Sequence, residues 1–199
     1  NTHTNILETQ TWNGFFAATY FVGDHAIKFG ADYEDNSVYN LFGRNTNGAY
    51  RFGCIDPIPA AGTNPACTAS FSSGNPNQYQ YFYPVDGDID NMAAEFAMSD
   101  FGLFAMDTWA VNSNLTVNYG FRYDLYSVDN EPTYNAIASN KFGYNNSNTI
   151  DGNSLFQPRV GFNYTFDSER PSQLRGGFGL FAGQSPTVWL ANPFSNNGL

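Results

Sequence analysis

The segment from Leu115 to Tyr126 constrains the fold more than any other part of the chain. Its sequence, LTVNYGFRYDLY, alternates without a break: odd positions hold Leu, Val, Tyr, Phe, Tyr and Leu, and even positions are mostly polar. An apolar row that is half aromatic, opposed by a row with Arg122 and Asp124 in mid-strand, is typical of a β-strand between lipid and a wet lumen. A tilted strand needs about 9–11 residues to cross a bilayer, and this segment is long enough.

The same alternation returns in residues 27–34, 158–166 and 174–181. Repetition matters because a single barrel strand gives a weak signal. Residues 11–21 permit either facing. In residues 101–110, the parity that turns Asp107 toward the lumen also turns Trp109 there. We expect Asp107 inside, because a charge that faces mid-bilayer lipid is destabilising.

The predicted strands are connected alternately by short turns and long loops. The short turns lie near residues 22–24, 111–114 and 167–171, and all contain turn-forming residues. Barrels of the bacterial outer membrane have short periplasmic turns and long extracellular loops. We therefore predict strands near residues 10–21, 25–36, 100–110, 114–126, 156–166 and 173–183, with long loops at 37–99, 127–154 and 185–199.

The predicted fold class is all-β: an antiparallel, up-and-down segment of a transmembrane β-barrel, with about six strands in three hairpins. The smallest membrane barrels have eight strands, and an open edge in lipid leaves backbone groups unpaired. The whole of residues 1–199 is therefore expected to be part of one outer-membrane barrel domain, either as a slice of a larger barrel or as one of several assembling copies.

Composition excludes several other classes of protein. No run approaches 18 consecutive apolar residues, so a membrane-spanning helix is not expected. Only 8 Lys and Arg residues stand against 18 Asp and Glu, a balance that argues against nucleic-acid binding. The amino terminus, NTHTN, lacks the charged and apolar regions of a signal peptide, which for a protein beyond the inner membrane indicates a processed chain or a fragment.

Several segments together resemble the barrel strands of TonB-dependent outer-membrane receptors, and more narrowly the Oar-like branch. They are HAIKFGADYE from His25, FGLFAMDTW from Phe101, the strand from Leu115 to Asp124, PRVGFNY from Pro158 and RGGFGLF from Arg175. The resemblance implies a 22-stranded barrel with a plugged lumen in the bacterial outer membrane, driven by the TonB complex through the plug domain. This chain contains no recognisable plug domain, no TonB box and no aromatic-ended terminal strand.

The alternation also predicts which polar side chains face the lumen. The inferred lumen-facing residues are Lys28, Asp32, Glu34, Asp107, Arg122, Asp124, Arg159, Asn163 and Arg175. Such residues can contact a plug or line a solute path. More commonly, a single residue of this kind only pairs across strands and solvates the interior.

The first long loop contains two further candidate sites. Cys54 and Cys67 are the only cysteines, and an extracellular loop is an oxidising setting, so we predict a disulfide between them. Asp86, Asp88 and Asp90 alternate as clustered ligands of Ca²⁺ would, but the EF-hand Gly and Glu are absent. An acidic solvated turn is favoured over a metal site.

No catalytic constellation is present: Ser185 lacks the context of a nucleophile elbow, and the two histidines lie near the amino terminus. We expect no enzyme and no cofactor. The expected function is the barrel portion of a TonB-dependent receptor that takes up an unknown solute, with outer-membrane lipid around it and a solute or extracellular partner at the loops. The alternatives are a passive structural or adhesion barrel, and a secreted glycan-binding β-sandwich.

Overall fold

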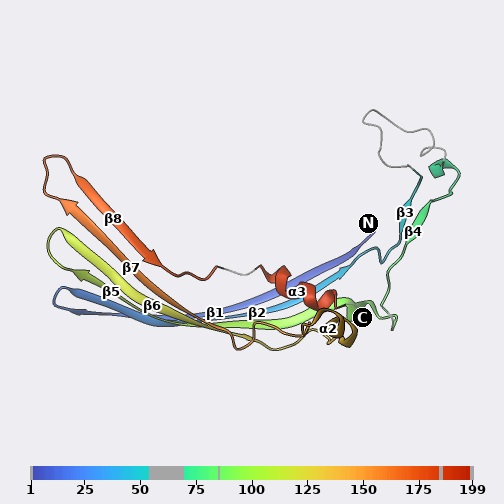
Figure 1. The fold of residues 1–199 in the computed structure, drawn as a ribbon, viewed down its shortest axis with the longest axis horizontal. Coiled ribbons are helices and arrows are strands. Elements are labelled where there is room, and N and C mark those ends of the chain that lie inside the picture. The colour runs from blue at the N-terminus through green and yellow to red at the C-terminus, as the bar shows by residue number, and fades with distance from the viewer. Residues whose placement is uncertain (1, 54–69, 85, 184–185, 198–199) are drawn as a thin grey trace. The chain divides into compact units, whose positions relative to one another are not determined.

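The computed structural model describes residues 2–53, 70–84, 86–183 and 186–197. Its main feature is a six-stranded sheet with the strand order β1-β2-β5-β6-β7-β8 (Figure 1). The strands are β1 (Thr4–Val22), β2 (His25–Gly43), β5 (Ala93–Ala110), β6 (Leu115–Val128), β7 (Ser154–Phe166) and β8 (Ser172–Gly179). Neighbours in the sheet follow one another in the chain, apart from the insertion between β2 and β5. The predicted all-β, up-and-down architecture is confirmed.

The chain divides into two compact units. The first contains residues 1–8 and 39–94, and the second contains residues 9–38 and 95–199. Within the first unit, β3 (Ala49–Arg51) pairs antiparallel with β4 (Gln78–Gln80), and a short 3-10 helix, η1, covers Ile89–Met92. Within the second, β5, β6, β7 and β8 pair antiparallel in a continuous register that runs from Met98 on β5 to Gly179 on β8. The unbroken register fixes which side chains share a face.

Short turns close the three hairpins as predicted. Gly23 adopts a positive φ of 55° in the two-residue connection between β1 and β2, a conformation that glycine takes without steric cost. In the next turn, the Asn112 side chain accepts hydrogen bonds from the backbone N–H groups of Asn114 and Leu115, each at 2.9 Å. Asn114 also reaches the neighbouring hairpin, because its Nδ2 donates to the carbonyl oxygen of Thr165 and to Asp167 Oδ1, both at 2.8 Å.

Several strands are longer than predicted, and β8 is shorter. β1 begins at Thr4, β2 continues to Gly43 and β5 begins at Ala93. In the added parts of β2 and β5, apolar residues stand next to one another instead of alternating strictly with polar ones, so the alternation gave no strand signal there. β8 ends at Gly179 instead of near residue 183. Pro158, the next residue of β7 to be paired, accepts a bond from the Leu180 N–H at 3.0 Å but has no N–H to return. The ladder therefore stops there.

The predicted long loops contain secondary structure that the sequence did not reveal. The segment after β6 contains α2 (Ala136–Phe142). The Asn135 side chain caps its start by accepting from the Ala138 N–H at 2.9 Å, and Gly143 caps its end. α3 (Thr187–Ser195) follows β8, and its Phe194 ring stacks on Phe96 of β5 with centroids 5.0 Å apart. None of the helices in the described ranges has both the length and the apolar composition needed to cross a membrane.

Candidate functional site

The two faces of the sheet in the second unit differ sharply in chemistry. Directly paired residues of antiparallel strands point to the same side. The register therefore gathers one face from the even positions of β5 and β6 and the odd positions of β7 and β8, which we call the polar face. The opposite, aromatic face carries Phe121, Tyr123, Phe156, Phe162 and Phe178, all of them exposed.

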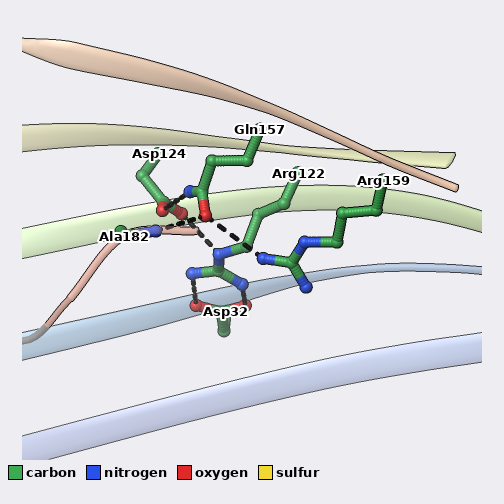
Figure 2. A network of polar contacts seen from close by, with 6 residues as sticks. All are labelled: Asp32, Arg122, Asp124, Gln157, Arg159 and Ala182. Carbon is green, nitrogen blue, oxygen red and sulfur yellow. Dashed lines mark hydrogen bonds and ion pairs between the residues drawn. The ribbon is translucent and has the colours of Figure 1, made fainter. Parts of the chain in front are cut away.

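An ion-pair cluster lies at the centre of the polar face (Figure 2). Arg122 of β6 binds both carboxylate oxygens of Asp32 on β2, from Nη1 at 2.5 Å and from Nη2 at 2.7 Å. Its Nε lies 2.6 Å from Oδ1 of Asp124, whose side chain is almost fully buried. Gly102 of β5 leaves the space that this arrangement occupies, because a Cβ there would lie 2.8 Å from Asp32 Oδ1. Two carboxylates thus more than balance the single positive charge of the guanidinium.

Gln157 of β7 extends the cluster toward β8. Its side chain is 1% exposed, and its Nε2 donates to Asp124 Oδ2. Its Oε1 accepts from Arg159 Nη2 at 3.1 Å and from the backbone N–H of Ala182 at 2.8 Å (Figure 2). The amide is therefore the link between the ion-pair cluster, the next arginine and the chain segment after β8.

Arg159 differs from Arg122 in its neighbours. Its guanidinium carbon lies 4.5 Å from the centroid of the Phe181 ring, and its Nε is buried with no hydrogen-bond partner. Beside it is a hollow of about 280 Å³, lined in part by Met106, Asn118, Gly177 and Gly179. A guanidinium that faces an aromatic ring and a neutral amide retains its net charge.

The remaining predicted lumen-facing residues can be traced to the faces of the sheet. Asp32 lies on the polar face through its contact with Arg122, and Lys28 and Glu34 share its parity on β2. Asn163 and Arg175 are paired directly opposite each other on the polar face. The structure brings together Asp32, Arg122 and Asp124, and joins Arg159 to them through Gln157, which the sequence analysis did not single out.

The placement of Asp107 on the polar face was wrong. Asp107 pairs with Tyr119 in the register of β5 and β6, so it lies on the aromatic face, as does Trp109 opposite Val117. Its Oδ2 lies 2.6 Å from Nδ1 of His25, whose ring stacks on Trp109 with centroids 5.3 Å apart. The cost that argued against this facing falls to about 0–1 kcal/mol near a membrane interface, and Asp107 lies close to the turn and has a partner.

The side-chain facing of β1, which the sequence left open, follows from one ring contact. Phe15 stacks on Phe104 of β5 with centroids 6.0 Å apart, and Phe104 is paired with Arg122. Thr11 of the same parity donates to Asn36 Oδ1 at 3.3 Å. The odd residues of β1 therefore lie on the polar face, and Trp12, Phe16 and Tyr20 lie on the aromatic face.

The acidic turn near residue 88 is built from its own hydrogen bonds. Asp86 accepts from the Asp88 N–H at 3.0 Å and from Asn91 Nδ2 at 2.5 Å, and the first of these bonds holds the pKa of the Asp86 carboxyl below its usual value. Asp88 accepts from the Asp90 N–H at 3.1 Å. In the described part of the chain, no three His, Cys, Asp or Glu side chains are grouped as metal ligands. Cys54 and Cys67 lie outside the described residues.

Aromatic rings form a continuous row on the paired strands β3 and β4 and on the residues that follow β4 in the first unit. Tyr50 contacts Tyr79 with centroids 4.6 Å apart, Tyr79 is followed by Tyr81 at 6.3 Å, and Tyr81 by Tyr83 at 5.7 Å. All four side chains are exposed. This row is an apolar surface that is not covered by the described residues of its own unit.

Comparison with known proteins gives the family. A family model described as an outer membrane beta barrel domain matches residues 1–198. The chain belongs to this family. Its localisation is accordingly the bacterial outer membrane, and the secreted β-sandwich alternative is overturned, since the sheet also has the up-and-down order of a barrel wall.

Among solved structures, the chain is similar to one titled copper transporter OprC, with 15% sequence identity and a TM-score of 0.49. The match covers 89% of this chain and 22% of that one, so the chain spans about a fifth of its length. No curated protein sequence matches.

Proposed function

We propose that this outer-membrane barrel chain is part of the wall of a TonB-dependent receptor of the Oar-like branch, with the polar face lining the solute path. The carrying observation is the cluster of Asp32, Arg122, Asp124 and Gln157 on one face, opposed by exposed aromatic side chains on the other. Charged and amide groups need water or partners, whereas aromatic rings lose little in lipid. The proposed role is non-catalytic.

The mechanism follows from this orientation. A solute is first captured by the long segments between strands, which we call the outer segments and which contain β3, β4, α2 and α3; among them the aromatic row from Tyr50 to Tyr83 offers exposed rings. It then passes along the polar face. Coupling to the TonB complex would act through a plug domain carried elsewhere in the full-length protein, and the strand resemblance to TonB-dependent receptors supports this step.

The test uses the full-length protein in its source cells and works for a solute of any identity. Spent medium from wild-type cells, cells lacking the protein and cells depleted of TonB is compared by mass spectrometry. The expected result is at least one solute whose removal from the medium requires both the protein and TonB. Removal that requires the protein but continues at the same rate without TonB would contradict the proposal.

A passive structural or adhesion barrel is the second candidate, supported by the bidentate Arg122–Asp32 pair, which braces adjacent parts of the wall without needing a solute. This second candidate predicts that no solute needs the protein for its removal from the medium. It also predicts that cell attachment or envelope integrity changes when the gene is deleted, with no effect of TonB depletion.

A further inference from the structure

The charge on the polar face is balanced unevenly between its two halves. Asp32 and Asp124 are both within ion-pair distance of Arg122, so that half carries its own counterions. The half formed by β7 and β8 carries Arg159 and Arg175, and the polar-face partners opposite them are Gly179 and Asn163. Within the described residues, no ion pair joins either arginine to a carboxylate.

Arg159 is held in place despite lacking a counterion. Gln157 fixes Nη2 through a hydrogen bond of 3.1 Å, and the Phe181 ring covers the guanidinium at 4.5 Å. Both partners are neutral, so they orient the group and leave its charge available. Pre-ordering a rotamer-rich side chain lowers the entropy cost of binding a ligand to it.

The hollow beside Arg159 has room for a small anionic group. Its volume is about 280 Å³, and its lining includes Met106, Asn118, Gly177, Gly179 and Phe181 with Arg159 as the charged member. Gly179 keeps the space open, because a Cβ there would lie 3.1 Å from Arg159 Cγ and 3.0 Å from the Phe181 ring. The lining contains no carboxylate that would repel an anion.

We propose that Arg159 and the hollow beside it bind the carboxylate or phosphate group of a solute. A planar guanidinium matches both groups through paired N–H donors, and the match is strengthened where bulk water is partly displaced. The hollow is smaller than a drug-sized pocket of about 300–1,000 Å³, so it would hold the anionic end of a larger solute or a small anion. This inference rests on the proposed role of the polar face as the wall of a solute path.

The test is a titration of purified full-length protein, in an uncharged sugar detergent, with inorganic phosphate followed by the broadening of its ³¹P resonance. Wild-type protein is expected to show saturable binding, and acetate is expected to compete if the site accepts carboxylates as well. Arg159→Gln is expected to weaken binding about tenfold or more, the loss of one charge-assisted contact. Arg175→Gln is the matched control: it removes the same charge from the same face and is expected to change binding less than about twofold.

A second variant tests the hollow separately from the charge. Gly179→Ala keeps Arg159 but fills the space next to it, and we expect binding several-fold weaker than in wild type. All variants are first checked for heat-modifiable migration, which reports a folded barrel. Absence of saturable binding, equal losses in the Arg159 and Arg175 variants, or full binding in Gly179→Ala would each overturn the inference.

These outcomes are separate from those for the proposed function. Phosphate binding is measured on purified protein and needs no TonB. If the purified protein binds no phosphate but TonB-dependent uptake is observed, only this inference is overturned. If the protein binds phosphate through Arg159 but no solute is removed in a TonB-dependent way, the receptor proposal is overturned and the anion site stands.

Discussion

Arg122 and Arg159 are on adjacent strands and the same face of the sheet, yet their surroundings are opposite. Arg122 is enclosed by two carboxylates at 2.5–2.7 Å, whereas Arg159 contacts an amide and an aromatic ring. A guanidinium that is already paired with carboxylates stabilises the sheet and has no free charge with which to bind an anionic solute. One that is held in position without a counterion remains able to bind an anion. Neighbouring residues of the same type can thus have different roles, decided by partners that lie on other strands.

The largest expected loss of stability comes from replacing Arg122, the arginine that is paired with two carboxylates. Arg122→Gln leaves Asp32 and the buried Asp124 without their counterion, and we expect the free energy of unfolding to fall by about 2–3 kcal/mol. That is below the value for a fully buried pair, because the Arg122 and Asp32 side chains are 22% and 27% exposed and water screens them. Urea unfolding in lipid vesicles measures the change. Arg159→Gln is expected to cost about 1 kcal/mol or less, and equal losses in both variants would break the comparison.

Gln157→Leu should have the next largest effect, because it disconnects the two halves. Asp124 and the Ala182 N–H each lose a partner, and we expect a loss of about 2 kcal/mol, within the range for buried groups left unsatisfied. Amide exchange at Ala182 is expected to become faster. Gln173→Leu, an exposed position on the same face, is the control and should leave both readouts unchanged. Unaltered exchange at Ala182 in the Gln157 variant would contradict the link.

Gly102→Ala tests the ion-pair cluster around Arg122 by placing a methyl group against it. The added methyl group would lie 2.8 Å from Asp32 Oδ1 and displace the Arg122 pair, at an expected cost of about 1 kcal/mol. Gly161→Ala is the matched control, since the nearest atom to its Cβ is a backbone oxygen at 3.5 Å. Urea unfolding compares the two variants. If Gly161→Ala is destabilised as much as Gly102→Ala, the loss comes from adding a methyl group to a strand and not from displacing the Arg122–Asp32 pair.

The smallest effect is expected at Asp151, a carboxylate outside both halves. Backbone N–H donation from Val128, with the Ser127 hydroxyl, holds the pKa of Asp151 below its usual value. A lowered folded-state pKa gives stability that is present above the unfolded-state pKa and lost as the pH falls through the folded one. Asp151→Asn should therefore speed amide exchange at Val128 slightly at neutral pH and have no effect in strong acid. If urea unfolding showed that Asp151→Asn lowers the free energy of unfolding more than Gly102→Ala does, the order of these two effects would be wrong.

The sequence predicted the strands and most of one face, and failed where contacts depend on register. Strict alternation around Arg122 identified β6 and its facing, because polar and apolar residues separate cleanly there. The sequence points Asp107 to the wrong face because it shows only an isolated charge, whereas the register gives it His25 and Tyr119 as neighbours. A single strand does not reveal its partners.

Two further parts of the structure left no usable signal in the sequence. Gln157 is uncharged and follows the same parity as Arg159, so nothing in the sequence marked it as the link between the halves. The outer segments contain β3, β4, α2 and α3, which are short and lack a periodic apolar pattern. Short elements of this kind are stabilised by local caps and by tertiary contacts such as Phe96 with Phe194, which appear only when distant residues meet.

The hairpin turns have a consequence for how such a protein can diversify. Pairing register is fixed at the tight connections, by Gly23 in one and by Asn112 and Asn114 in another. The outer segments do not set it. Mutations that lengthen, shorten or exchange an outer segment therefore leave the two strands of each hairpin aligned, so the outer segments can change quickly on a wall that stays the same.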